Sequence, residues 1–537
     1  MLRRIFGYLF LALMLTALVQ CARRGSPSGG PKDETPPVLL EAQPENMTVN
    51  FKTDKIRLYF DEYIKLKDVQ EQLIISPPLK NRPEITPQGG ARKYIEIILK
   101  DTLKDSTTYT FNFGQSVVDN NEENPYSFFN YVFSTGSYVD SLSIIGVITD
   151  ALNEKADNFV SVMLYEMDST YTDSTVYKSP PTYITNTLDS TNIFKLNNLK
   201  AGKYALFALK DEGKNNMFDQ KIDKIGYLGY PITIPTDSIF ALNMFKEISD
   251  YSAVVPSFTA KNKIVFGYYG EGKNIKIETL TPLPDSVRTK ITKEPKKDTL
   301  NYWITDYKAD SLMFRVINEA QKAIDTFIIK PRKLAIDTMV VKTSGNSSIS
   351  IEDPFYITSN TPIHKIDTSK IEIINKDSVR ISLKTKLDSI GNKLDFNLDI
   401  PKEDNYNITV YPEAITDFFG NINDTLVYNL SPKDETQLAV IQLDLVGAVT
   451  YPAIVQLLDQ SKKVVREIFA STQQTFTFKN VNPATYNLRV ISDTNGNRKW
   501  DTGNYLKKQI PEKVSYYPEE ISLRAYSEEK IQFEIIK

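Results

Sequence analysis

The chain has 537 residues, with 64 Lys or Arg and 67 Asp or Glu, so its formal net charge is −3. This balance gives no reason to expect a nucleic acid as partner, because such binding needs a marked excess of basic side chains. The single histidine, His364, argues against Ser-His-Asp and Cys-His catalytic sites and against any multi-histidine metal site.

The first twenty residues are typical of a secretory signal peptide. Arg3 and Arg4 form a short basic start, and an apolar run follows from Ile5 to Val19. This run is shorter than the roughly 20 residues that a membrane-spanning helix needs. We therefore predict that residues 1–20 are a signal peptide.

The apolar run ends at Cys21, the only cysteine of the chain. The sequence Leu18-Val19-Gln20-Cys21 resembles the lipobox of bacterial lipoproteins, although Gln20 stands where a small residue is usual. The resemblance implies that Cys21 carries a lipid, which anchors the chain to a membrane without spanning it. The alternatives are a free buried cysteine and an uncleaved anchor helix.

Residues 21–35 are rich in Gly, Ser and Pro, which predicts a flexible tether after the lipidated cysteine. No acidic cluster follows Cys21. We expect anchoring to the outer membrane. Lipoproteins that are exported to the cell surface use such a cluster, so by comparison with them its absence favours the periplasmic side over the cell surface.

The rest of the chain has the periodicity of β-strands almost throughout. Apolar and polar residues alternate in residues 56–61, 109–113 and 476–478, and clusters of Gly, Pro, Asn, Asp and Ser separate such runs. The many Tyr and Phe residues suit pleated, half-buried surfaces. We predict an all-β chain of tandem β-sandwiches.

The first predicted module covers residues 36–138. It contains the motifs Phe60-Asp61-Glu62, Leu103 to Tyr109, Val118-Asp119 and Phe133-Ser134-Thr135. Together they resemble the SbsA-type bacterial Ig-like domain of S-layer and other envelope proteins. Residues 346–435 resemble the same domain, with a clearer Asp417-Phe418-Phe419-Gly420-Asn421 turn. Gly420 tolerates the positive φ that such a turn needs.

Residues 139–250 and 436–537 are predicted to be two copies of one module. Seven positions match without a gap at a constant offset of 282: Phe194 with Phe476, Leu199 with Val481, Tyr204 with Tyr486, Leu206 with Leu488, Asp211 with Asp493, Asn215 with Asn497, and Asp219 with Asp501. Both copies resemble the prealbumin-like domains, also called carboxypeptidase-regulatory-like domains. The resemblance implies small seven-stranded sandwiches without activity of their own.

A polar turn in each copy resembles part of a calcium loop. Its candidate oxygen ligands stand at positions 1, 5 and 9, with one more at position 3 of the second copy: Asp211, Asn215 and Asp219, then Asp493, Asn495, Asn497 and Asp501. The bidentate Glu of an EF-hand is missing, because Ile222 and Asn504 occupy position 12. The alternative is a plain hairpin turn, for which Asn495-Gly496-Asn497 is well suited.

Residues 251–345 have strand-like stretches and are predicted to be a further sandwich of unassigned family. Trp303 in this segment is interpreted as a core residue, with an exposed binding aromatic as the alternative. His364 is interpreted as a surface residue.

These features favour a non-enzymatic lipoprotein of the cell envelope. We expect a structural or protein-binding scaffold, such as an accessory subunit of an outer-membrane assembly, that binds other envelope proteins through sheet edges and module junctions. The alternative is a carbohydrate-binding or adhesive surface lipoprotein that uses exposed aromatics. A hydrolase with paired carboxylates is a third hypothesis, although no pair stands out. No cofactor is expected apart from the calcium just described.

Overall fold

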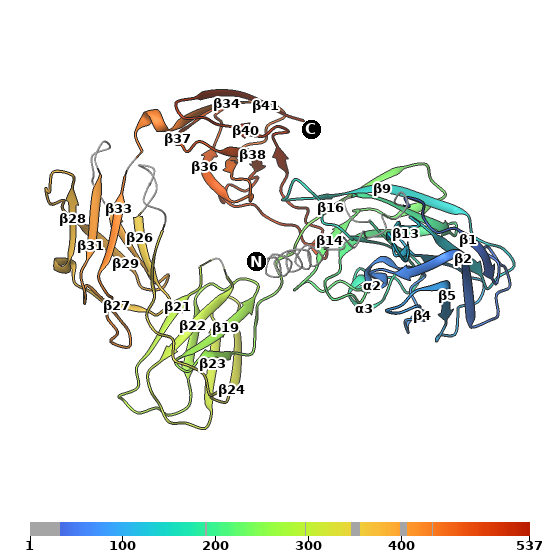
Figure 1. Ribbon diagram of the computed structural model, residues 1–537, viewed down its shortest axis with the longest axis horizontal. Helices are drawn as coiled ribbons and strands as arrows, with labels where there is room; N and C mark the ends of the chain where they lie inside the picture. The colour runs from blue at the N-terminus through green and yellow to red at the C-terminus, as the bar shows by residue number, and fades with distance from the viewer. Residues whose placement is uncertain are drawn as a thin grey trace, which may run out of the picture. The chain divides into compact units, whose positions relative to one another are not determined.

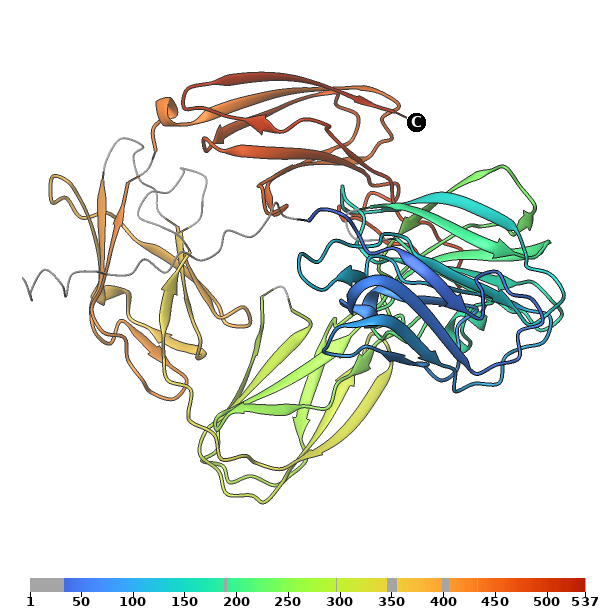
Figure 2. The same cartoon turned by 45° about the vertical axis from the view of Figure 1, so that its right-hand side comes forward.

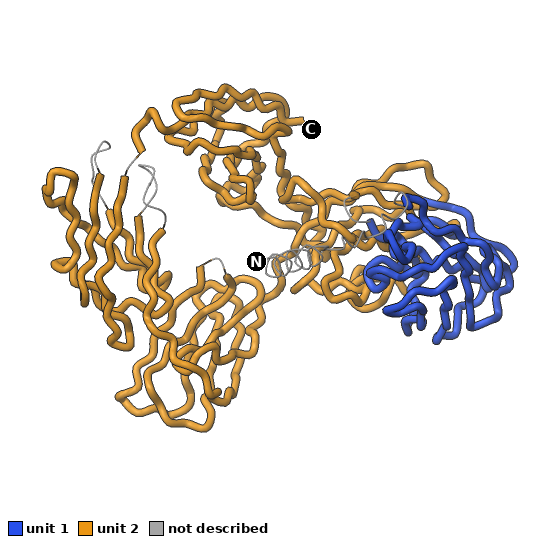
Figure 3. Tube along the Cα trace, viewed as in Figure 1, with its two compact units in different colours: residues 1–143, 183–188, 197–200 blue, residues 144–182, 189–196, 201–537 orange. Residues whose placement is uncertain are grey.

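The computed structural model describes residues 33–187, 191–295, 297–344, 355–397, 405–431 and 433–536 (Figure 1). Within these ranges nearly all regular structure is β, which confirms the all-β prediction. The helical elements there are single turns: α2 (Val69–Gln72), α3 (Thr175–Lys178), η1 (Thr368–Lys370) and η2 (Glu435–Gln437). The chain divides into two compact units (Figure 3).

The first unit contains the first predicted module, which is built from two sheets. One has the order β1-β2-β5-β4, with β7 also pairing with β2, and the other has the order β3-β6-β8. The strands are β1 (Leu39–Gln43), β2 (Lys55–Leu66), β3 (Ile74–Ser76), β4 (Glu84–Thr86), β5 (Arg92–Ile98), β6 (Thr108–Asn112), β7 (Val117–Asp119) and β8 (Asn130–Ser134).

The core of this module follows from the period-two pattern. Alternate residues of β2, namely Ile56, Leu58 and Phe60, are buried, as the pleat of a strand requires. Phe133 of β8 lies in the aromatic part of the core, with its ring centroid 3.8 Å from that of Phe51 and 5.5 Å from that of Tyr109.

The first unit is discontinuous in the sequence. It also includes residues 183–188, with strand β11 (Tyr183–Asn186), and residues 197–200. The backbone N–H of Ile184 donates to Ser76 Oγ at 3.1 Å. Asn198 Nδ2 donates to the carbonyl of Asp140 at 2.8 Å, and Asn198 Oδ1 accepts from Thr110 Oγ1 at 3.2 Å. Segments beyond residue 138 therefore complete this unit.

The second predicted module supplies the start of the second unit. Strands β10, β13 and β14 lie side by side in one sheet, β15 also pairs with β13, and β16 pairs with β9 in parallel. The strands are β9 (Leu142–Asp150), β10 (Ser161–Glu166), β12 (Ile193–Leu199), β13 (Gly202–Lys210), β14 (Lys224–Tyr227), β15 (Ile232–Ile234) and β16 (Ile239–Met244).

The fifth module repeats this topology. Its sheets have the orders β37-β34-β41 and β36-β35-β38-β39, with β40 also pairing with β38. The last strand, β41, pairs with β34 in parallel, as β16 does with β9. Figure 2 shows this red C-terminal segment as two layers of strands. The strands are β34 (Ala439–Gly447), β35 (Ala453–Leu458), β36 (Val464–Ala470), β37 (Thr475–Val481), β38 (Thr485–Ser492), β39 (Val514–Tyr516), β40 (Ile521–Ser522) and β41 (Glu528–Ile535).

The third module, within residues 251–345, has two sheets. One has the order β17-β19-β22-β21, with β18 also pairing with β19, and the other has the order β20-β23-β24. The strands are β17 (Ser252–Ala253), β18 (Ser257–Ala260), β19 (Lys263–Tyr269), β20 (Ile275–Thr279), β21 (Thr289–Lys293), β22 (Thr299–Ile304), β23 (Leu312–Asn318) and β24 (Ala323–Ile329).

The fourth module, within residues 346–435, has sheets of the orders β25-β26-β30-β29, β28-β31-β33 and β27-β32, and β25 comes from just before this range. The strands are β25 (Val341–Thr343), β26 (Phe355–Ser359), β27 (Ile363–Ile366), β28 (Ile371–Asn375), β29 (Lys384–Asp388), β30 (Lys393–Asn397), β31 (Tyr406–Val410), β32 (Ile415–Asp417) and β33 (Leu426–Leu430).

Candidate functional site

The candidate calcium ligands lie in two equivalent loops of the repeated module. The first polar loop (residues 211–223) connects β13 to β14, and the second polar loop (residues 493–512) connects β38 to β39. In both modules these two strands pair antiparallel, so each loop closes a β-hairpin.

In the first polar loop, each predicted ligand uses a side-chain oxygen to hold the backbone. Asp211 Oδ2 accepts the N–H of Asn216 at 2.7 Å, and Asn215 Oδ1 accepts the N–H of Met217 at 2.8 Å. Asp219 Oδ1 accepts the N–H of Lys221 at 2.9 Å. These are the local side-chain to backbone bonds by which Asp and Asn stabilise turns.

The second polar loop repeats the first two of these bonds at the offset of 282, whereas its third ligand accepts side-chain amides. Asp493, which is fully buried, accepts the N–H of Arg498 on Oδ2 at 2.8 Å. Asn497 Oδ1 accepts the N–H of Lys499 at 2.8 Å. Asp501 Oδ2 accepts from the side-chain amides of Asn495 and Asn497, the latter at 2.8 Å. The structure thus brings Asn495, Asn497 and Asp501 together.

Two further carboxylates organise the loops, and they were missed in the sequence. Asp223 accepts the N–H of Glu212 at 2.9 Å and that of Asp219 at 2.7 Å. Glu512 accepts the equivalent N–H groups, those of Thr494 at 2.7 Å and Asp501 at 3.0 Å. Both residues are buried, and burial raises the pKa of the Asp223 carboxyl.

The signal in the sequence that points to Asp223 and Glu512 is a change in the spacing between matched residues of the two copies. Asp223-Lys224 and Glu512-Lys513 are 289 positions apart, seven more than the other matched pairs. Three residues separate Asp219 from Asp223, whereas ten separate Asp501 from Glu512. A comparison that allowed a gap after Asp501 would have found the second carboxylate.

The loops fit a cation only in part. Carboxylate and amide oxygens are the ligands that calcium prefers, and Asp211 Oδ1 is buried without a hydrogen-bond partner among the described residues. However, the described residues contain no group of three or more His, Cys, Asp or Glu side chains that could hold a metal ion. The turn interpretation accounts for the hydrogen bonds described above for both loops, and the calcium site stays a prediction.

The structure also places Trp303 and His364. Trp303 is buried, which confirms the interpretation as a core residue. Its Nε1 donates to Thr292 Oγ1 at 2.8 Å, and its ring centroid lies 6.1 Å from that of Phe419 in the fourth module. Beside it, Arg288 donates to the carbonyl of Phe418 at 2.8 Å. His364 is exposed on β27, as expected.

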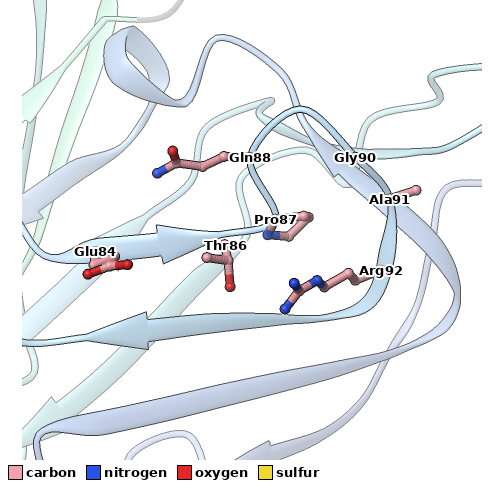
Figure 4. A pocket seen from close by; sticks show the side chains of 7 residues that line it. All are labelled: Glu84, Thr86, Pro87, Gln88, Gly90, Ala91 and Arg92. Atoms are coloured by element: carbon pink, nitrogen blue, oxygen red, sulfur yellow. The ribbon is translucent and has the colours of Figure 1, made fainter.

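Two hollows lie on the surface. One, of about 250 Å³, is formed by a single hairpin between β4 and β5 (Figure 4), with Glu84 and Arg92 at its ends. The other, of about 620 Å³, lies between the strands around Tyr302 and includes Ile277, Leu283 and Lys290.

The predicted signal peptide, Cys21 and most of the predicted tether lie outside the described residues, so the signal peptide, the tether and lipidation stay predictions. Among the residues that the structure describes, no helix has the length and apolar character needed to cross a membrane.

Comparison with solved structures returns the following similar proteins, each with a TM-score of 0.15 or less. The S-layer protein rSbsC(31-844) is 12% identical, with a TM-score of 0.15, over 91% of this chain and 68% of that chain. The major pilin subunit BcpA of Bacillus cereus is 11% identical, with a TM-score of 0.14, over 74% and 99%. The BSP domain of a biofilm-associated protein is 8% identical, with a TM-score of 0.13, over 94% and 99%.

A search of curated proteins finds no match. Comparison with family models matches residues 33–135 to the bacterial Ig-like domain. This match bears out the resemblance expected from the motifs of the first module, and it covers the strands from β1 to β8. Residues 33–135 are therefore the part of the chain that is similar to the bacterial Ig-like domain family.

Proposed function

We propose that the chain is a non-enzymatic scaffold lipoprotein, anchored to the outer membrane through Cys21 and facing the periplasm, where it binds other envelope proteins. A bacterial Ig-like first module and prealbumin-like second and fifth modules would serve as spacers and binding surfaces. The observation that carries the proposal is the exposure of apolar side chains on edge strands of several modules.

The clearest such edge is β24 of the third module, which ends the sheet β20-β23-β24. Ile324 and Ile328 on its outer face are 66% and 63% exposed. Edge strands of other described sheets also expose apolar residues, namely Leu40 of β1, Ile239 of β16 and Val427 of β33. An exposed edge with apolar side chains can accept a strand of a partner, which supplies main-chain hydrogen bonds and side-chain contacts.

Cross-linking in intact cells followed by mass spectrometry tests the scaffold. We expect stable envelope partners, with cross-links concentrated near β24, and weaker capture by Ile328→Lys than by the control Ile536→Lys. Ile536 is exposed near the C-terminus and lies outside the strands. The absence of any stable partner would contradict the proposal.

The anchor is tested separately. Cys21→Ser should abolish incorporation of a labelled fatty acid and release the chain from the membrane fraction, whereas Ser28→Ala in the tether should do neither. Protease treatment of intact cells then tests the face of the membrane, because a periplasmic chain is protected.

The alternative is an adhesive or carbohydrate-binding surface lipoprotein. Tyr526 of the fifth module favours it, because this aromatic side chain is 78% exposed and aromatic rings stack on sugars. Binding to a glycan array that Tyr526→Ala abolishes, together with cleavage by external protease, would support this function over the scaffold.

A further inference from the structure

Tyr505 of the second polar loop is buried in an aromatic pocket of the second module. Its side chain is only 2% exposed. Its ring centroid lies 4.9 Å from that of Tyr227 and 5.1 Å from that of Phe207, both edge-to-face, and 6.4 Å from that of Tyr177. Aromatic pairs at these distances stabilise a structure by more than the burial of their apolar area alone.

Polar contacts fix the backbone of the loop at the rim of this pocket. Glu247, only 3% exposed, accepts the backbone N–H of Tyr505 at 2.5 Å and the side-chain amide of Asn504 at 3.4 Å. Its third donor is Gln220 of its own module, at 2.7 Å. Two of the three donors that satisfy this buried carboxylate therefore come from the fifth module, 257 and 258 residues away.

The tip of the tyrosine and the next turn add charged contacts. Tyr505 Oη donates to Asp173 Oδ1 at 3.2 Å, and Lys508 Nζ lies 3.0 Å from Asp173 Oδ2. On the other side, Thr502 Oγ1 donates to the carbonyl of Lys246 at 2.6 Å. The loop is thus held at both ends and at its centre.

The docked residues lie in the segment that is seven residues longer in the second copy of the module. Asn504, Tyr505 and Lys508 belong to the ten residues between Asp501 and Glu512, where the first copy has three. Gly503 makes the close approach possible, since a Cβ there would lie 2.7 Å from the Phe245 ring and 2.8 Å from the carbonyl of Gln509. The insertion therefore provides the contact with the second module.

The equivalent face of the fifth module contacts the second module in return. Arg489 and Tyr516 stand at the positions of Phe207 and Tyr227 in the repeat, and both donate to the carbonyl of Leu152, at 3.3 and 2.8 Å. Lys462 Nζ lies 2.7 Å from Glu154 Oε2 beside them. The same face of each copy thus meets a turn of the other copy.

We propose that residues 502–509 form a clasp, an intramolecular ligand that occupies the aromatic pocket of the second module and joins the second and fifth modules into one body. The occupant is the loop of the same chain, because both modules belong to one polypeptide and their effective concentration exceeds that of a second copy. An open clasp would expose Tyr177, Phe207 and Tyr227 and would take from Glu247 the two donors that the loop supplies. This cost keeps the clasp closed.

Zero-length cross-linking of the full chain tests the clasp. A carbodiimide joins a lysine to a carboxylate only when they touch, so we expect the amides Lys508–Asp173 and Lys462–Glu154 in the mass spectrum. A mixture of ¹⁵N-labelled and unlabelled chains should give cross-linked peptides of one isotope only. Absence of both amides, or peptides that combine the two isotopes, would overturn a clasp within one chain; the latter would indicate exchange between copies.

Variants separate the clasp from general folding. Tyr505→Ala should lower the yield of both amides on the order of tenfold, as expected for a buried anchor of an interface. The nearly isosteric Glu247→Gln should lower it in the same direction, because an amide N–H₂ would face a donor. Tyr526→Ala, an exposed tyrosine of the same module, is the control and should keep the wild-type yield. Unchanged yields in both Tyr505→Ala and Glu247→Gln would overturn the proposal.

Discussion

Asp223 and Glu512 hold equivalent backbone N–H groups in the two copies of the repeated module, although they differ in type and are displaced from the common offset. Each carboxylate stands at the last position of its polar loop and accepts the N–H groups of the second and ninth residues of that loop, with four N–H···O distances between 2.7 and 3.0 Å. A longer side chain in the second copy reaches the same donors across a loop that is seven residues longer.

We expect Asp223→Asn to loosen the first polar loop. The amide nitrogen would face one of the two N–H donors, and a buried donor left unsatisfied costs about 1–3 kcal/mol. Hydrogen exchange of the Glu212 and Asp219 amides should therefore become faster. Asp237→Asn, an exposed aspartate of the same module, is the control. Unchanged exchange in Asp223→Asn would show that the carboxylate does not hold the loop.

The same carboxylate gives the loop a pH dependence of defined sign. Burial raises the pKa of the Asp223 carboxyl above the ordinary value of 3.8. Its two hydrogen bonds from backbone N–H groups lower the pKa, but burial outweighs them. A raised native pKa means that folding favours the protonated form, so the contribution of Asp223 is lost as the pH rises through that pKa. The protection of the loop amides from hydrogen exchange, corrected for intrinsic exchange, should therefore fall in the wild type as the pH rises through this pKa. It should fall less in Asp223→Asn.

Calcium provides a test of the polar loops as a pair. The turn interpretation predicts that neither calcium nor a chelator shifts the melting temperature, because each candidate ligand of the first polar loop already uses one side-chain oxygen to accept a backbone N–H group. A specific site would instead raise the melting temperature with calcium, and Asp211→Asn would remove part of that shift. Lys214→Gln, a change of charge without loss of a predicted ligand, is the control for general salt effects. A calcium shift sensitive to Asp211 would reject the turn interpretation.

Asp119 in the bacterial Ig-like domain should show the opposite pH dependence. Burial raises the pKa of its carboxyl, but the N–H groups of residues 121–124 outweigh this and hold the pKa below its ordinary value. The contribution of Asp119 to stability is therefore fully present above the pKa that its carboxyl has in the unfolded chain. It is lost as the pH falls through the lower pKa of the native state. Asp119→Ala should accordingly destabilise the domain by about 1–3 kcal/mol at neutral pH.

Hydrogen exchange of the β6 and β8 amides, measured at neutral pH and near pH 3, checks this prediction. The difference between Asp119→Ala and the wild type should shrink at the lower pH. Asp105→Ala, which removes an exposed aspartate of the same domain, should behave as the wild type at both pH values. A difference that stays constant with pH would mean that the charge of Asp119 is not involved.

The sequence predicted what local patterns determine. The alternation of apolar and polar residues predicted the strands. Trp303, in the strand-like sequence Asn301-Tyr302-Trp303, was predicted to be a core residue and is buried. Contacts between distant segments were not predictable. Tyr505 lies among Asn504, Leu506 and Lys507, and no periodicity distinguishes a docked tyrosine from an exposed one in such a loop. The insertion also hid Glu512, because a gapless match ends where loop lengths diverge.

Gly146 offers a stringent test of the strand pairing in the repeated module. It lies directly opposite Phe240 in the parallel pair β9–β16. A Cβ at Gly146 would lie 2.2 Å from the Phe240 carbonyl oxygen and 2.5 Å from the Phe194 ring, so the backbone would have to separate. We expect Gly146→Ala to lower the free energy of unfolding by about 1–3 kcal/mol, the usual effect of overpacking a core. It should also speed hydrogen exchange of the amides along β16. Gly229→Ala, where a Cβ would meet nothing within 4 Å, is the matched control. Equal exchange in both variants would show that β9 and β16 do not pair as described.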